Sequence, residues 1–143
     1  MTNATLSEIL RRFAESDCSW LTTVRPGCRP HSAPIWHVWT NSRAYVVTTP
    51  TAVKVTNIRQ NSAVVLTHPD PHSAIIIDGQ ASIVHGMDDQ LRPLFKEKYD
   101  WDIVTDEDYT TIIEITPQKL LAWGEEGAGH LKRWTGEELL APM

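Results

Sequence analysis

The chain has 143 residues, of which 41% are hydrophobic, and its formal net charge is -5. This length suits a single domain, residues 1–143, that can bury a core without disulfide bonds, so we expect Cys18 and Cys28 to be free thiols. The acidic balance disfavours nucleic acid as a partner. No apolar run approaches membrane-spanning length and no signal-like segment begins the chain, so we expect a cytoplasmic protein without a membrane partner.

The histidines do not indicate a built metal site. His31 and His37 face the same side of one predicted strand, but about 20 Å of extended chain separates them, too far to share a metal. His68 and His72 flank a Pro-Asp-Pro segment without a Cys or third His at metal-site spacing, which leaves only adventitious zinc binding open. We therefore expect no metal.

The first element is predicted to be an amphipathic helix. Thr5 and Glu8 have the spacing of a capping box, in which the two side chains satisfy backbone N–H groups at a helix start. Apolar residues recur at helical spacing, at Leu6, Ile9, Leu10 and Phe13.

A β-hairpin is predicted next. Leu21–Val24 is a short apolar and β-branched run, Pro26-Gly27 is typical of a turn, and Pro30–Trp39 is a longer run without helical period. After a turn at Asn41-Ser42, the composition of 44–49 favours a third strand.

The helix after the third strand is a candidate phosphate site. Thr51 is predicted to cap a helix that continues through Lys54 and Ile58. Unpaired N–H groups, the positive end of the helix dipole, hydroxyls and an ammonium would then lie within one turn, which suits a phosphate. A solvated surface lysine remains the alternative interpretation, because a capped helix after a strand is common.

The rest of the chain predicts strands at its centre and near its end. These are 64–66 and 75–81, then 111–115 and 119–123 divided by Thr116-Pro117. A helix over 89–99 requires Pro93 in its first turn. The acidic segment 100–108 is predicted to be a loop, and 124–129 a flexible segment. Without βαβ alternation, the pattern indicates a mostly antiparallel barrel with attached helices.

These residues resemble the flavin-binding split-barrel family that includes pyridoxamine 5'-phosphate oxidase and reductases that use FMN or deazaflavin. The resemblance extends over nearly the whole chain and is carried mainly by Trp20–Gly27, Arg29–His31, Pro34–Trp36, Thr48-Thr49, Lys54, Asn57-Ile58 and Asn61. It implies a mostly β protein with flanking helices, a split antiparallel barrel of about six strands, and a homodimer whose protomers share two cofactor sites.

The resemblance also implies which residues contact the cofactor, with FMN expected and deazaflavin as the alternative. These are the strand residues Ala33, Pro34, Ile35 and Trp36, the strand end at Val47, Thr48 and Thr49, the phosphate lysine Lys54, and near the carboxyl end Trp123 and Arg133. Without the resemblance, a core tryptophan and a surface arginine would be the ordinary interpretation of the last pair. No catalytic side chain is assigned.

Departures from the family pattern bear on the substrate. Val53 and Ala33 stand where the oxidase has phosphate-binding arginines, so other cations such as Arg29, Lys132 or Arg133 would have to compensate. Gly129 and Leu131 replace the Arg-x-His that recognises the vitamin substrate. We therefore expect a protein that does not make pyridoxal phosphate.

The sequence thus favours an FMN-dependent oxidoreductase that acts on a small conjugated substrate. A deazaflavin-dependent reductase of the same fold is the nearest alternative. A non-catalytic flavin- or haem-binding protein is a third hypothesis, from a different functional class, and the missing arginines are compatible with it.

Overall fold

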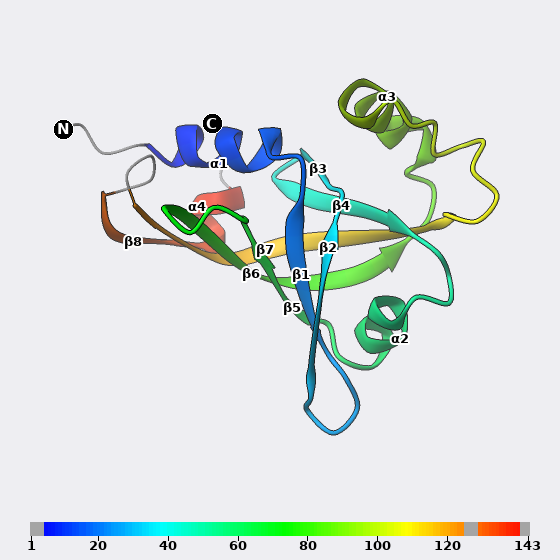
Figure 1. Ribbon diagram of the computed structural model, residues 1–143, viewed down its shortest axis with the longest axis horizontal. Coiled ribbons are helices and arrows are strands. Elements are labelled where there is room, and N and C mark those ends of the chain that lie inside the picture. The colour runs from blue at the N-terminus through cyan, green and yellow to red at the C-terminus, as the bar shows by residue number, and fades with distance from the viewer. Residues whose placement is uncertain (1–4, 125–128, 141–143) are drawn as a thin grey trace.

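The computed structural model describes residues 5–124 and 129–140. Within these ranges the protein is mostly β, as predicted, with helices at its margins (Figure 1). The elements in chain order are α1 (Leu6–Glu15), β1 (Ser19–Val24), β2 (Pro30–Ile35), β3 (Val38–Thr40), β4 (Arg43–Thr48), α2 (Val53–Gln60), β5 (Ala63–Thr67), β6 (Ser73–Val84), α3 (Asp88–Tyr99), β7 (Thr111–Gly124), β8 (Gly129–Thr135) and α4 (Gly136–Leu140).

In the described part of the chain, the strands form one eight-stranded antiparallel sheet. Seven of them follow the order β2-β1-β5-β6-β7-β4-β3, and the eighth, β8, pairs with β7. Strand β7 is its organising element. One edge of β7 pairs with β6 along most of its length, whereas the other pairs with β4 in its first half and with β8 in its second half. The sheet curls into the split barrel that the sequence predicts.

The main core joins α1 to the strands of the sheet. Buried Ile9, Leu10 and Phe13 of α1 pack there against residues of the strands, including Leu66 and Ile113. Because the capping box of Thr5 and Glu8 forms as predicted, this helix begins where its apolar face can reach the sheet. A second cluster joins α3 to β3, β4 and β7 through Leu91, Phe95 and Ile112, among others. Both α2 and α3 lie on the side of the sheet where β4 ends, here called the β4 end (Figure 1).

The predicted cap of α2 is wrong. Its N-cap is Ala52, which has no side-chain hydrogen bond, and Thr51 lies one residue earlier in the turn. The Ala52 N–H instead bonds to the carbonyl of Thr49, so the turn after β4 is closed by backbone alone. The N–H groups of Val55 and Thr56 bond to the Ala52 carbonyl. No side-chain cap occupies those of Val53 and Lys54, which stay available to another acceptor.

Pro93 is not in the first turn of its helix. Helix α3 starts at Asp88, so Pro93 is its sixth residue, where it lacks the N–H that would bond to the Asp89 carbonyl. The side chain of Pro93 is exposed, while Leu91 and Phe95 on either side are buried. Packing of this apolar face stabilises the helix despite the missing hydrogen bond.

Two predicted strand boundaries are also wrong. The run Pro30–Trp39 is divided, because β2 pairs with β1 and ends at Ile35, whereas β3 pairs with β4 and begins at Val38. Conversely, Thr116-Pro117 does not divide β7. The register with β6 shifts by one residue beside Gly79, which pairs with Pro117, and this bulge accommodates the proline within a continuous strand.

Strand β8 was not predicted. Its sequence lacks a β-branched run, and its backbone is ordered by pairing with β7. The predicted flexible segment 124–129 begins in β7 and ends in β8, and its residues 125–128 lie outside the described ranges.

Candidate functional site

A cavity of about 680 Å³ opens where several chain segments meet at the β4 end of the sheet. These segments are the ends of β2 and β4, the start of α2, the end of α3 and the loop that follows α3. The residues that line it are Cys18, Pro34, Ile35, Trp36, Val46, Val47, Thr48, Lys54, Tyr99, Asp100, Trp101, Asp106 and Tyr109. The volume lies within the range of about 300–1,000 Å³ that is usual for small-molecule sites.

Six of the ten residues predicted from the sequence line this cavity, namely Pro34, Ile35, Trp36, Val47, Thr48 and Lys54. Ala33 precedes them in β2, and Thr49 directly follows the end of β4, but neither lines the cavity. Trp123 and Arg133 lie apart from it, in the half of β7 that pairs with β8 and in β8 itself. A single protomer thus brings together the strand residues and the lysine, but not the carboxyl-terminal pair.

Lys54 gives the cavity a positive charge where α2 begins. It is the second residue of α2, so its ammonium and the uncapped start of that helix belong to the same turn. Partial burial lowers the pKa of Lys54, and no carboxylate of the described residues forms an ion pair with it. A half-buried cation without a counter-ion favours an anionic ligand.

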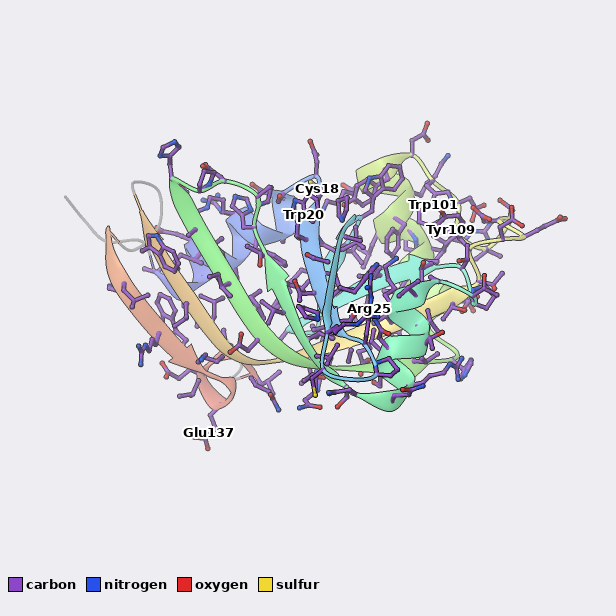
Figure 2. All side chains as sticks on the ribbon, turned by 60° about the horizontal axis from the view of Figure 1, so that its bottom comes forward. Cys18, Trp20, Arg25, Trp101, Tyr109 and Glu137 are labelled. Atoms are coloured by element: carbon purple, nitrogen blue, oxygen red, sulfur yellow. The ribbon has the colours of Figure 1, made fainter. Side chains whose placement is uncertain are left out.

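Aromatic rings form one wall of the cavity. Trp36 stacks on Tyr99, while Trp101 meets the edge of Trp36 with ring centroids 5.9 Å apart. Tyr109 in turn packs edge-on against Trp101, at 5.7 Å, and these two lie side by side on the loop between α3 and β7 (Figure 2). Phe95 supports Trp101 from the second core cluster. The cavity is therefore suited to a planar conjugated ring.

A buried histidine fixes the break between β2 and β3. His37 Nε2 donates to the Phe13 carbonyl at 2.9 Å, because a carbonyl can only accept, and Nδ1 then accepts from the Ser19 hydroxyl at 2.9 Å. Burial lowers the pKa of His37 to about 4. The imidazole is neutral at physiological pH, and it holds the adjacent Trp36 at the cavity.

The last turn of α3 fixes the same break from the other side. The ammonium of Lys98 donates to the carbonyls of Ala14 and His37, at 2.8 and 2.7 Å. The Tyr99 hydroxyl donates to the Asp17 carbonyl at 2.8 Å and accepts from the His37 N–H at 3.1 Å. Burial lowers the pKa of Lys98 to about 8 and raises that of Tyr99 to about 12. These bonds join the end of α3 to the end of α1 with its following loop and to the break between β2 and β3.

Two carboxylates of the loop after α3, Asp100 and Asp106, also line the cavity. Asp100 pairs with Lys96, and that hydrogen bond lowers the pKa of Asp100. The carboxylate of Asp106 accepts hydrogen bonds from the backbone N–H groups of Tyr109 and Asp108 and from the Trp101 indole. The bond from Tyr109, and after it the bond from Asp108, lowers the pKa of Asp106. Both groups are ionised at neutral pH, and Asp106 holds the aromatic loop in shape.

The sequence interpretation missed the contribution of this loop. The residues not anticipated are Cys18, Val46, Tyr99, Asp100, Trp101, Asp106 and Tyr109. Three of them are aromatic residues placed around an acidic run, a pattern that is unusual for a purely solvated loop. This pattern is the signal that could have identified them.

Neither a metal centre nor a membrane-spanning helix is found in the ranges that the structure describes. No group of three or more His, Cys, Asp or Glu side chains among these residues could hold a metal ion. Among the same residues, no helix is both long enough and apolar enough to cross a membrane. Both cysteines are free, and Cys18 is the one that reaches the cavity.

Several solved structures share this fold. A heme binding protein from Mycobacterium smegmatis has a TM-score of 0.72 at 14% identity; the match covers 98% of this chain but only 62% of that one, so this chain spans less than two thirds of its length. An F420 reductase has a TM-score of 0.65 at 23% identity, over 77% of this chain and 94% of the other. A FAD-binding protein from Mesorhizobium loti has a TM-score of 0.65 at 14% identity, with 82% and 92% covered.

At these identities the structural similarity shows a common fold. No curated protein matches the chain in sequence. Membership of a family is shown by a different comparison, in which the family described as Pyridoxamine 5'-phosphate oxidase matches residues 6–124. This range includes the whole lining of the cavity. The chain therefore belongs to the pyridoxamine 5'-phosphate oxidase family.

Proposed function

We propose that this protein binds FMN in the cavity and catalyses hydride transfer to or from a small conjugated substrate other than pyridoxamine phosphate. The observation that supports this proposal best is the meeting of Lys54, the uncapped start of α2 and the end of β2 around one cavity with an aromatic wall. Lys54 and the start of α2 suit the anionic tail of a flavin nucleotide. The backbone of β2 suits its polar groups, and the aromatic wall suits its planar ring.

The phosphate would lie at the α2 end. Backbone N–H groups in the first turn of that helix have no side-chain cap, and Lys54 beside them has no carboxylate partner among the described residues. An anion there would satisfy the helix start and restore the favourable solvation that Lys54 loses on burial.

The ring would lie between the end of β2 and the aromatic wall. Strand β2 is an edge of the sheet, so its outer N–H and C=O groups are not used in strand pairing and can orient a polar ring edge. The flavin, when bound, supplies the hydride chemistry, while the protein supplies binding, orientation and exclusion of water. This division of roles explains why no acid–base side chain needs to be assigned.

We further propose that the protein is a homodimer with shared sites. Trp123 and Arg133 do not line the cavity of their own protomer, and Trp123 is 37% exposed, as suits a residue that a second protomer covers. In the dimer, the second copy of this pair would complete the cavity over the ring.

Pyridoxamine phosphate is not the substrate in this proposal. Among the described residues that line the cavity, Lys54 is the lone cation, and it is committed to the cofactor phosphate. Gly129 and Leu131 stand where the oxidase pattern places the Arg-x-His for the substrate. A second phosphate in this cavity would meet the carboxylates of Asp100 and Asp106 instead.

Deazaflavin is the second candidate cofactor. A single lysine at the phosphate end favours it as much as FMN, and one structural neighbour is an F420 reductase. A haem carrier is less well supported, because none of the described residues lining the cavity is a histidine, and His37 nearby uses both ring nitrogens in hydrogen bonds.

The absorption spectrum of the freshly purified protein, followed by calorimetric titration with FMN and with deazaflavin, tests the proposal. We expect a flavin spectrum, or saturable FMN binding by colourless protein, and no turnover of pyridoxamine phosphate by the FMN-loaded dimer. Failure to bind either cofactor would contradict the proposal. Ready turnover of pyridoxamine phosphate would contradict its statement about the substrate.

A further inference from the structure

The cavity lining carries charges of both signs. Lys54 lies at the start of α2, whereas Asp100 and Asp106 come from the loop after α3. If FMN occupies the cavity as proposed above, its phosphate pairs with Lys54. The part that remains for a substrate is then bordered by carboxylates.

These carboxylates belong to a strongly acidic segment. Residues 100–108 contain five acidic and no basic side chains. Arg92 and Lys96 on α3 pair with Asp102 and Asp100, respectively. Asp106 receives hydrogen bonds from two backbone N–H groups and from the Trp101 indole, but none of the described cations forms an ion pair with it. The segment 100–108 therefore keeps an excess of negative charge.

Aromatic rings stand beside these carboxylates. Trp36 is 50% exposed and Tyr109 43%, and Trp101 joins the two by edge contacts. Figure 2 shows Trp101 and Tyr109 together on this loop. The face of an indole or phenol ring attracts a cation, and a conjugated cation also stacks on it. The carboxylates and the aromatic faces thus both favour a positively charged ligand.

We propose that the substrate is a planar conjugated ring that carries a positive charge, such as an N-alkylated heteroaromatic cation, held between Trp36, Trp101 and Tyr109 and facing Asp100 and Asp106. This inference rests on the proposed function for the location of the cofactor. It goes beyond that function by naming the class of substrate and the loop that selects it.

Calorimetric titration of the protein, saturated with FMN, against three ring probes of similar size tests the selectivity. The probes are N-methylquinolinium as the cation, quinoline at pH 8 as the neutral ring and 1-naphthoate as the anion. We expect N-methylquinolinium to bind about tenfold more tightly than quinoline, and 1-naphthoate to bind most weakly.

Matched variants assign the selectivity to the loop. Asp100→Asn suits the left-handed backbone of residue 100, where φ is 52°. Asp106→Asn keeps an oxygen for the N–H groups of Asp108 and Tyr109 but replaces the acceptor of the Trp101 indole N–H by an NH2 group. In the double variant we expect the tenfold preference to fall to about threefold or less. Asp100→Asn alone leaves the acceptor of the Trp101 indole in place and should lower the preference by about twofold. Asp108→Asn is the control, because it removes the same charge from the same loop outside the cavity lining; its preference should stay within about twofold of the parent.

Several results would overturn the inference: anion binding as tight as cation binding, no saturable binding of any probe, an unchanged preference in the double variant, or an equal loss in Asp108→Asn. Repeating the titrations without FMN separates this inference from the proposed function. If FMN does not bind while the cation preference and its dependence on Asp100 and Asp106 persist, the proposed cofactor is wrong and the charge selectivity stands.

Discussion

The indole of Trp36 lies flat against the phenol of Tyr99, with ring centroids 4.4 Å apart and an angle of 2° between the rings. This contact joins the break between β2 and β3 to the last turn of α3. The hydroxyl of Tyr99 also bonds to the backbone of His37 beside Trp36. The position of the aromatic wall therefore depends on how α3 packs.

Substitution of Tyr99 separates the stacking from the hydrogen bonds. Tyr99→Phe keeps the ring and should cost about 1–2 kcal/mol of stability, while FMN affinity stays within about threefold of the parent. Tyr99→Leu removes the ring as well and should weaken FMN binding about tenfold, in line with the value of an aromatic pair. Urea unfolding and FMN titration measure the two effects. Equal FMN affinity of the two variants would exclude a role for the stack.

Gly79 is required by the sheet rather than by the cofactor. A Cβ at this position would lie 2.8 Å from the Thr116 carbonyl oxygen and 2.9 Å from Ile115 Cγ2, beside the bulge in β7. We expect Gly79→Ala to lower the free energy of unfolding by about 1–3 kcal/mol. Ser82→Ala, at an exposed position of the same strand, is the control and should stay within about 0.5 kcal/mol. Chemical denaturation of both variants checks this, and equal stability would show that the bulge adapts without cost.

Protonation of His37 should destabilise the fold in acid. In the native state burial lowers its pKa from 6.5 to about 4. As pH falls below 6.5, His37 binds a proton in the unfolded chain but not in the folded chain. The stability that comes from keeping His37 neutral is therefore complete above pH 6.5 and is lost between pH 6.5 and pH 4. The loss should reach about 3 kcal/mol.

Unfolding of the parent and of His37→Gln between pH 7 and pH 4 measures this contribution. Glutamine can still donate to the Phe13 carbonyl but does not titrate in this range. The parent should therefore lose more stability than the variant, by about 3 kcal/mol, while the carboxylate contributions cancel in the difference. Parallel pH profiles would show that His37 does not titrate with unfolding.

The family resemblance was sufficient to predict which residues of the regular elements meet at the cavity, although not where those elements begin and end. It predicts that Trp36, Thr48 and Lys54 contact one cofactor, and the structure brings these three together at one cavity. The loop that completes the cavity could not be located in the same way. Trp101 and Tyr109 have no periodicity that fixes their direction, and their positions depend on packing against Trp36 and Phe95.

The errors in the strand boundaries have a similar cause. A proline usually ends a strand, but a register shift beside Gly79 accommodates Pro117 within β7. His37 lies in an apolar run that reads as continuous strand, yet its bonds to Phe13 and Ser19 turn the chain between two partners. In both places a tertiary contact that no short window contains overrides the local pattern.

The central claim is that the cavity holds a flavin nucleotide with its phosphate at Lys54. Titration of the parent and of Lys54→Ala with FMN and with riboflavin, which lacks the phosphate, tests it most directly. Arg59→Ala is the matched control, because Arg59 is an exposed cation of the same helix outside the cavity lining.

We predict that Lys54→Ala weakens FMN binding by about 10- to 100-fold, as expected for one charge-assisted contact, and leaves riboflavin binding unchanged. Arg59→Ala should change the affinity for neither compound. Undiminished FMN binding by Lys54→Ala, or an equal loss for riboflavin, would contradict the account.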